Sequence, residues 1–304
     1  MRLSWEKSII ATLNFFDLFD QPLTQEELFR FLYNPPAGVQ AEFLSVLDSG
    51  MGKWCETFCG YYFLPGRKEI VEARRRRTVD NDKKLKIARR GARLVGWVPF
   101  VRAVFLCNTT AWQTANPDSD IDFFIVIRHG RIWLARALVT LTLSLFGLRR
   151  HGRKVENRIC LSFYITDENL NLRPVSTSAP DIYLVYWLSQ LLFLGGENAI
   201  LASLYGANRW VQELLPNAFN FLASDEATYK SRTKRFLEKM WGAGYGDLLE
   251  SQARSAQLTR MKMFKGPKGA VGDGCRVVIS DKMLKFHEQD RREEIREKWL
   301  KRVV

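Results

Sequence analysis

The segment Leu106–Ile127 constrains this chain more than any other, because it places two carboxylates at the start of an apolar strand. It reads LCNTTAWQTANPDSDIDFFIVI. Its last five residues, from Phe123 onward, are apolar and rich in β-formers, which predicts a buried strand. Residues two apart on a strand point to the same face, so Asp120 and Asp122 are expected to project together. Adjacent carboxylates repel each other unless a cation lies between them, which predicts a divalent metal site.

A small polar turn precedes this acidic pair. The apolar run that ends at Leu106 leads into Asn108, Thr109 and Thr110, and a short segment then runs to Pro117. Backbone N–H groups in such a turn can bind a phosphate. Mg²⁺ takes carboxylate and phosphate oxygens as ligands. A turn and an acidic pair in this order therefore predict metal-assisted phosphoryl or nucleotidyl transfer.

The order of strand, small-residue turn, short helix and then Asp-x-Asp on the next strand resembles the nucleotidyltransferase superfamily, which has a polymerase-beta-like fold. The resemblance covers roughly residues 98–170, and the whole chain resembles uncharacterised bacterial proteins with a winged helix before such a domain. It implies transfer of a nucleoside monophosphate from an NTP to an acceptor hydroxyl, with Mg²⁺ or Mn²⁺ as cofactor. By position, Asp120 and Asp122 would be the catalytic metal ligands. Asn108, Thr109 and Ser119 would contact the nucleotide.

Two positions depart from the superfamily pattern. Asn108 stands where Gly is usual, although Asn tolerates a left-handed backbone better than most residues. The usual third carboxylate lies on a later strand, and the best candidate strand, Ile159–Ile165, carries none. Asp167 and Glu168 follow just beyond that strand. The alternative interpretation is therefore a catalytically inactive protein that keeps the fold to bind nucleic acid or another partner.

The charge balance favours an acidic partner. The chain has 46 Lys and Arg against 33 Asp and Glu, a formal net charge of +13. Nucleic acid, a nucleotide and anionic lipid all fit this charge, which does not choose among them. The resemblance implies an NTP as substrate, and the basic charge balance makes RNA or DNA the expected acceptor. Small-molecule and protein acceptors also occur across the superfamily that the chain resembles. The oligomeric state is not indicated.

The cysteines do not predict a disulfide framework or a zinc site. The chain has five cysteines, an odd number without framework spacing. Cys107 and Cys160 lie in apolar strands and are predicted to be core thiols. The N-terminal sequence MRLSWEKS does not begin a signal-peptide pattern. These features predict a reducing, cytoplasmic setting.

Residues 1–66 are predicted to form a winged helix. Three short helical patterns are followed by two strands that flank Gly60 and would form the wing. Thr24 and Glu27 have the spacing of a capping box at the start of the second helix. The presumed recognition helix, Gln40–Leu47, has no Lys or Arg, whereas a helix that enters a DNA groove meets phosphates with positive charge. Protein docking is therefore favoured over DNA binding for this unit.

Residues 67–97 are predicted to form a basic helical connector. Arg74, Arg75, Arg76 and Arg77 are consecutive there and are candidate nucleic-acid contacts. The alternative is an ordinary solvated linker helix. Four adjacent cations repel one another without a partner, which slightly favours phosphate contact.

The rest of the chain completes a predicted α+β protein. Residues 98–175 are expected to form a mixed-sheet nucleotidyltransferase-like domain, and residues 176–304 a helical C-terminal region. The apolar run Ile132–Leu148 approaches the roughly 20 residues that a membrane span needs. Its place between two strands favours a buried crossover helix instead, so no stable membrane insertion is expected. Asp281–Val303 is predicted to be a charged helix.

Overall fold

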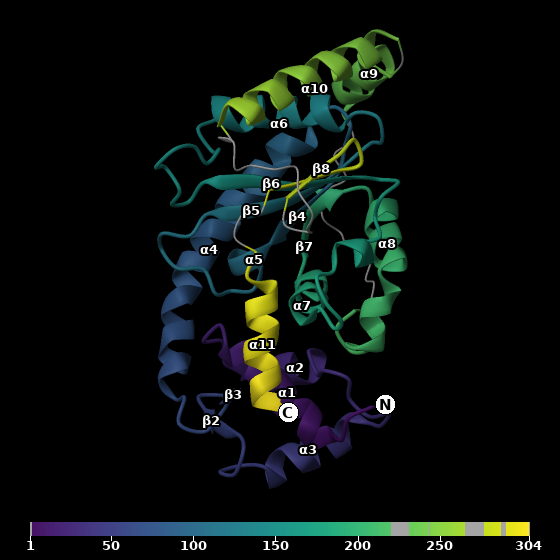
Figure 1. Ribbon diagram of the computed structural model, residues 1–304. Coiled ribbons are helices and arrows are strands. Elements are labelled where there is room, and N and C mark those ends of the chain that lie inside the picture. The colour runs from purple at the N-terminus through teal and green to yellow at the C-terminus, as the bar shows by residue number, and fades with distance from the viewer. Residues whose placement is uncertain (1, 220–230, 243, 265–276, 287–289, 304) are drawn as a thin grey trace.

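The computed structural model describes residues 2–219, 231–242, 244–264, 277–286 and 290–303. Within these ranges the protein has a mixed α+β architecture, with one small sheet near the N-terminus and a six-stranded sheet at the centre (Figure 1). Helices cover both faces of the central sheet.

The N-terminal unit combines three helices with a small antiparallel sheet of strand order β1-β3-β2. The predicted capping box is confirmed, because the Thr24 side chain accepts from the Glu27 N–H and the Glu27 side chain accepts from the Thr24 N–H. The predicted hairpin is also confirmed, as strands β2 and β3. The elements of the unit are α1 (Trp5–Asp17), β1 (Leu23–Thr24), α2 (Gln25–Arg30), α3 (Gln40–Ser49), β2 (Glu56–Phe58) and β3 (Tyr61–Phe63).

Helix α4 (Glu69–Gly96) connects this unit to the central sheet and is 28 residues long. At 1.5 Å per residue it spans roughly 40 Å, and it runs along one side of the molecule (Figure 1). Its buried side carries small and aliphatic residues, among them Ala88, Ala92 and Val95, which pack on the central sheet. Gly91 allows a close approach there, since a Cβ atom would lie 2.2 Å from Ile159 Cδ1.

The four consecutive arginines of α4, which were predicted to contact nucleic acid, do not form one face of the helix. Successive helical residues turn by about 100°, so the four side chains diverge. Arg74 is buried and its guanidinium donates to the Glu27 carboxylate at 2.7 Å. Arg77 donates to backbone carbonyl groups of the N-terminal unit. Only Arg75 and Arg76 keep exposed side chains, so half of the predicted contact set braces α4 against the N-terminal unit.

The central sheet has the strand order β7-β4-β5-β6-β9-β8. Strands β5 and β6 are parallel and are joined through helix α6 (Ile132–Leu145), as predicted for a crossover helix. The other neighbouring pairs are antiparallel. The strands are β4 (Val101–Cys107), β5 (Ile121–Ile127), β6 (Ile159–Thr166), β7 (Leu192–Gly196), β8 (Val277–Ile279) and β9 (Met283–Phe286).

Strand β5 is apolar because it is buried on both faces. Phe123 and Ile125 pack on the face covered by α4 and α6, and Phe124 and Val126 pack on the opposite face. Outside α6 lies α10 (Tyr245–Phe264), next to α9 (Arg232–Met240). The opposite face carries α5 (Asn108–Ala111), α7 (Ile182–Ser189), α8 (Asn198–Ala207), α11 (Arg292–Val303) and the N-terminal unit (Figure 1).

The C-terminal region is not purely helical, which corrects that prediction. It supplies three of the six central strands, because β7 pairs with β4 and the β8–β9 hairpin pairs with β6. Leu284, expected on a helix, lies on β9 opposite Tyr164. The physical reason is that β4 and β6 would otherwise be sheet edges with unpaired backbone groups. The predicted charged helix begins only at Arg292.

The N-terminal unit shares its core with the C-terminal region. The indole of Trp299 on α11 is buried and donates to the Ala11 carbonyl oxygen at 2.8 Å. The Tyr186 hydroxyl on α7 donates to the Phe31 carbonyl oxygen at 3.0 Å. The rings of Phe15 and Tyr186 stack with centroids 4.1 Å apart. The unit is therefore docked on α7 and α11 rather than tethered by α4 alone.

Among the described residues, no helix has the length and apolar character needed to cross a bilayer.

Replacing Trp299 with Ala is expected to lower the free energy of unfolding by roughly 3–5 kcal/mol, because it leaves a cavity and removes the bond to Ala11. Urea denaturation measures the change. Trp97→Ala is the matched control, since that indole is 64% exposed and its loss should cost less than about 1 kcal/mol. Equal effects of the two substitutions would contradict the docking role of α11.

Candidate metal and nucleotide site

Asp120 and Asp122 lie together, and a third side chain joins them. One ligand atom each from Asp120, Asp122 and Cys160 lie within 4.8 Å of one another. The register of the sheet explains the meeting, because Asp122 on β5 pairs with Cys160 on the parallel strand β6. The neighbours Ile121 and Phe123 point to the α4–α6 face. Asp122 therefore points to the opposite face, toward α7.

The segment before Asp120 is held in place by Lys84 of α4. Its buried ammonium group donates to the carbonyl oxygens of Pro117 at 2.8 Å and Ser119 at 2.7 Å, and to Asn157 Oδ1 at 3.1 Å. Three oxygens compensate for burying this cation. Lys84 was missed from the sequence because its neighbours Lys83 and Lys86 in the same basic stretch are exposed, and nothing local distinguishes it from them. The oxygen atoms that Lys84 contacts belong to residues 33 to 73 positions away in the sequence.

Arg150 lies across the group of ligand atoms. Its guanidinium is bonded to Asp120 Oδ2 and lies 3.9 Å from Cys160 Sγ. Its side chain is 45% exposed, so the pair is open to solvent and weak by the standard of buried ion pairs. A divalent ion at this site would compete with Arg150 for Asp120.

Asp167 does not supply a third carboxylate here. Its N–H donates to the carbonyl oxygen of Ile127 at 2.8 Å, which places it at the far end of β5 from Asp122. Five residues of strand separate the two positions, or roughly 16 Å. Asp167 is engaged instead by Arg102 at 3.9 Å and by His129.

Cys160 takes that position instead, which corrects its prediction as a core thiol. It is half-buried rather than enclosed, whereas Cys107 is fully buried as predicted. Parallel strands begin at the same edge of a sheet. The signal in the sequence is therefore the pairing of these strands. If β5 and β6 are taken as parallel neighbours, Cys160 lies beside Asp122.

The turn residue Asn108 connects the acidic pair to α7. Its backbone has a φ of +56°, the left-handed conformation that its sequence position suggested. Its Oδ1 accepts a hydrogen bond from the Trp187 indole at 2.8 Å, and its side chain also bonds to the Asp122 carboxylate. Of the predicted nucleotide contacts, Thr109 lies on α5 and Ser119 lies in the segment between α5 and β5. Thr109 is exposed, and Ser119 Oγ accepts from the Asn116 N–H at 3.0 Å.

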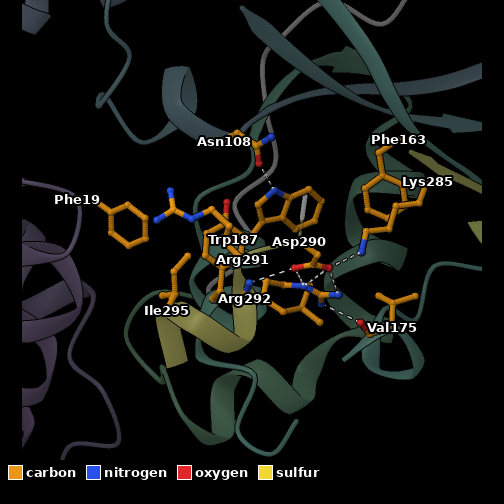
Figure 2. A pocket seen from close by; sticks show the side chains of 12 residues that line it. Phe19, Asn108, Phe163, Val175, Trp187, Lys285, Asp290, Arg291, Arg292 and Ile295 are labelled. Atoms are coloured by element: carbon orange, nitrogen blue, oxygen red, sulfur yellow. Dashed lines mark hydrogen bonds and ion pairs between the residues drawn. The ribbon is translucent and has the colours of Figure 1, made fainter. Parts of the chain in front are cut away.

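A cavity of about 250 Å³ opens beside Asn108 (Figure 2). Aromatic side chains from three parts of the chain form its walls. Charged side chains from β9, from the start of α11 and from the two residues before α11 form another side. A planar group of nucleobase size can stack on such aromatic walls. The lining includes Phe19, Phe163, Tyr183, Trp187, Lys285, Asp290, Arg291 and Arg292.

Buried ion pairs fix the charged side of this cavity. Arg292 donates to Asp181 at 2.8 Å and to Asp290 at 2.7 Å, and Lys285 lies 3.5 Å from the same Asp290 carboxylate. Burial opposes ionisation of Asp290, but hydrogen bonds and charge from Arg292 outweigh it and lower the pKa of Asp290 to about 2. Asp181 also caps α7 through the Leu184 N–H. The network therefore ties α7, β9 and α11 together. Figure 2 shows the part of it that joins Lys285, Asp290, Arg292 and Val175.

The acidic pair carries the electrostatic strain that its sequence predicts. Burial and the charge of Asp120 raise the pKa of Asp122 to about 7, although hydrogen bonds from Asn108 and Cys160 oppose the shift. Burial and the same two carboxylates raise the pKa of Cys160 to about 12. Both shifts show that the site disfavours further negative charge and favours a cation.

The donor set fits a divalent ion. Two carboxylates suit Mg²⁺ or Mn²⁺, which prefer oxygen ligands. The thiol adds a ligand that Zn²⁺ accepts and Mg²⁺ does not. Asp120, Asp122 and Cys160 would hold the ion and leave at least one coordination position for a substrate oxygen.

Replacing Asp122 with Asn is expected to stabilise the protein at about pH 8 and to have little effect at about pH 4. The folded protein keeps on Asp122 a proton that the unfolded chain releases above its ordinary pKa, so wild-type stability falls as pH rises toward 7. The gain at the higher pH should be roughly 2–4 kcal/mol. Urea denaturation with EDTA measures it, and Asp118→Asn controls for loss of a negative charge in the same segment. A gain that does not change with pH would contradict the strain.

Comparison with known proteins adds no assignment to this geometry. No model of a protein family, no curated protein and no solved structure matches the chain. The features of the chain that bear on its function are the arrangement of Asp120, Asp122 and Cys160 and the cavity beside Asn108.

Proposed function

We propose that the protein is a nucleotidyltransferase that moves a nucleoside monophosphate from an NTP to an acceptor hydroxyl. The observation that carries the proposal is the convergence of Asp120, Asp122 and Cys160 on one edge of the sheet, beside an aromatic cavity that Asn108 borders. A divalent ion held there supplies charge neutralisation for the phosphates and orients them. The ring walls of the cavity suit the base or another planar part of a substrate.

Each residue of the site has a separate role in this proposal. Asp120 and Asp122 bind the ion, and Cys160 completes the ligand set as a thiolate. Lys84 is a positioning residue, because it fixes the carbonyl groups on either side of Asp118 and thereby the approach to Asp120. Asn108 orients the Asp122 carboxylate and the Trp187 ring at the same time.

We propose nucleic acid as the acceptor class. Exposed cations lie on both sides of Lys84, on α4 at Lys83 and Lys86, and others lie in the segment after α6 at Arg153 and Lys154. That segment also carries Arg150, which contacts Asp120. A polyanion that follows these cations would therefore reach the acidic pair.

The N-terminal unit has the element order of a winged helix, and we propose that it serves as a docking module. Its helix α3 contains no Lys or Arg, which leaves it without the charge that groove binding needs. Its core is continuous with α7 and α11. Because α7 and α11 also line the cavity, packing of the N-terminal unit against these two helices helps to hold the cavity walls in place.

The alternative function is a catalytically inactive protein that binds nucleic acid or a partner. Two observations favour it. Arg150 forms a salt bridge with Asp120, and the thiol of Cys160 lies where the superfamily that the chain resembles has a third carboxylate. A guanidinium already balances part of the acidic charge, so the arrangement is compatible with a permanent ion pair.

The two functions separate in a transfer assay. The protein is incubated with each labelled NTP, total RNA or DNA, and Mg²⁺, Mn²⁺ or Zn²⁺. Transfer by the wild type should fall at least about 100-fold in Asp120→Asn, which loses a charged metal ligand. Asp118→Asn, two residues away and exposed, is the matched control and should retain transfer. Salt-sensitive nucleic-acid binding without transfer under every condition would support the inactive protein instead.

Replacing Cys160 with Asp tests the ligand set directly. A third carboxylate should strengthen Mg²⁺ binding by roughly tenfold, because Mg²⁺ prefers an all-oxygen site. Cys160→Ser should weaken Zn²⁺ binding by at least about tenfold and leave Mg²⁺ binding nearly unchanged. Isothermal titration calorimetry measures all three proteins. Unchanged affinities across the series would remove Cys160 from the site.

A further inference from the structure

An exposed apolar surface lies on the far side of the sheet from the acidic pair. The second half of helix α6 exposes Leu141 and Leu145, and Phe146 follows directly, with exposed fractions of 54%, 76% and 53%. Trp97, just after α4, is 64% exposed. Large apolar side chains that are gathered on a surface mark a binding site more often than isolated ones do.

These side chains belong to one continuous patch. A groove between α4 and α6 is lined by Trp97, Leu138, Thr142 and Phe146, among others. Leu141 and Leu145 lie three residues from Leu138 and Thr142, respectively, so they are neighbours on the same side of the helix. We call Trp97, Leu141, Leu145 and Phe146, together with the groove, the α4–α6 patch.

Arginines border the apolar part of the patch. Arg90 and Arg93 line the same groove, and both are exposed. They precede Trp97 by seven and four residues, which places all three along one side of α4. Among the described residues that line the groove, none is acidic. The patch therefore combines an apolar centre with a positively charged border.

We propose that the α4–α6 patch binds the surface of an anionic lipid bilayer. Leucine and phenylalanine enter the boundary between headgroups and acyl chains, tryptophan favours the same depth, and arginine reaches the lipid phosphates. The net charge of +13 adds a long-range attraction to an anionic surface. Binding is peripheral, since no described helix is suited to cross a membrane.

Other occupants fit the patch less well. Two copies of this chain that meet through the patch about a twofold axis would bring their arginines together, and the like charges would repel. A nucleic acid would satisfy Arg90 and Arg93 but would leave the leucines in water. A bilayer satisfies both parts of the patch.

The placement leaves the proposed site open. The patch lies on the side of the sheet covered by α4 and α6, whereas Asp122 and the aromatic cavity lie on the side of α7 and α11 (Figure 1). A protein bound through the patch would present its acidic pair away from the lipid. This inference does not depend on the reaction that the site carries out.

Vesicle flotation of the full chain tests the proposal. The wild type should float with vesicles of phosphatidylcholine and phosphatidylglycerol, and at least about tenfold less with phosphatidylcholine alone. Added salt should weaken binding. The double variant Leu145→Ser/Phe146→Ser should lower binding at least about tenfold through lost apolar burial. Arg90→Gln/Arg93→Gln should lower it by a similar factor through lost charge.

Matched variants outside the patch complete the experiment. Val79→Ser alters an apolar side chain of α4 that is 75% exposed, and Lys53→Gln/Arg173→Gln removes two exposed cations elsewhere. Both controls should bind within about twofold of the wild type. Absence of flotation, equal flotation with both vesicle types, or equal loss in the controls would overturn the proposal. A patch-dependent interaction with RNA or a protein in place of vesicles would overturn it as well.

Discussion

The structure depends on one electrostatic constraint, which is a carboxylate held at the start of a strand that is buried on both faces. Asp122 cannot turn away from Asp120, because Ile121 and Phe123 anchor β5 in the core on the opposite side. Burial and the neighbouring charge together raise the pKa of Asp122. A group that weakens the fold at neutral pH is the kind of feature that functional sites retain. Three side chains from other parts of the chain contact the acidic pair: Arg150 contacts Asp120, and Asn108 and Cys160 contact Asp122.

Three sets of contacts fix the positions of the acidic pair and the neighbouring cavity. Lys84 fixes the segment before Asp120 from α4, and the register of β5 and β6 sets Cys160 beside Asp122. Arg292 joins α7 and α11 on the other side of the cavity. Because α11 also carries Trp299, which anchors the N-terminal unit, the cavity and the docked unit share one support. Loosening α11 should therefore disturb the cavity as well as the N-terminal unit.

The two faces of the central sheet carry different chemistry. One face bears the acidic pair, the aromatic cavity and the docked N-terminal unit. The other bears α4 and α6, whose outer sides expose leucines, aromatic rings and arginines. The two environments along helix α6 explain why its sequence is apolar enough to resemble a membrane span. Its first half is buried as a crossover helix, while its second half keeps apolar side chains at the surface.

Local patterns in the sequence determined the features that depend on short spacing. The capping box of Thr24 and Glu27, the left-handed turn at Asn108 and the shared direction of Asp120 and Asp122 follow from residues at most three positions apart. Only the tertiary structure decided the rest of the site. Cys160 lies beside the acidic pair because of the register of β5 and β6, and Lys84 reaches the segment before Asp120 from the long helix α4. Strand β9 pairs with β6, although the sequence of that region predicted a helix. These contacts join segments tens of residues apart. The periods of 2 residues in strands and 3.6 residues in helices do not specify which distant segments meet.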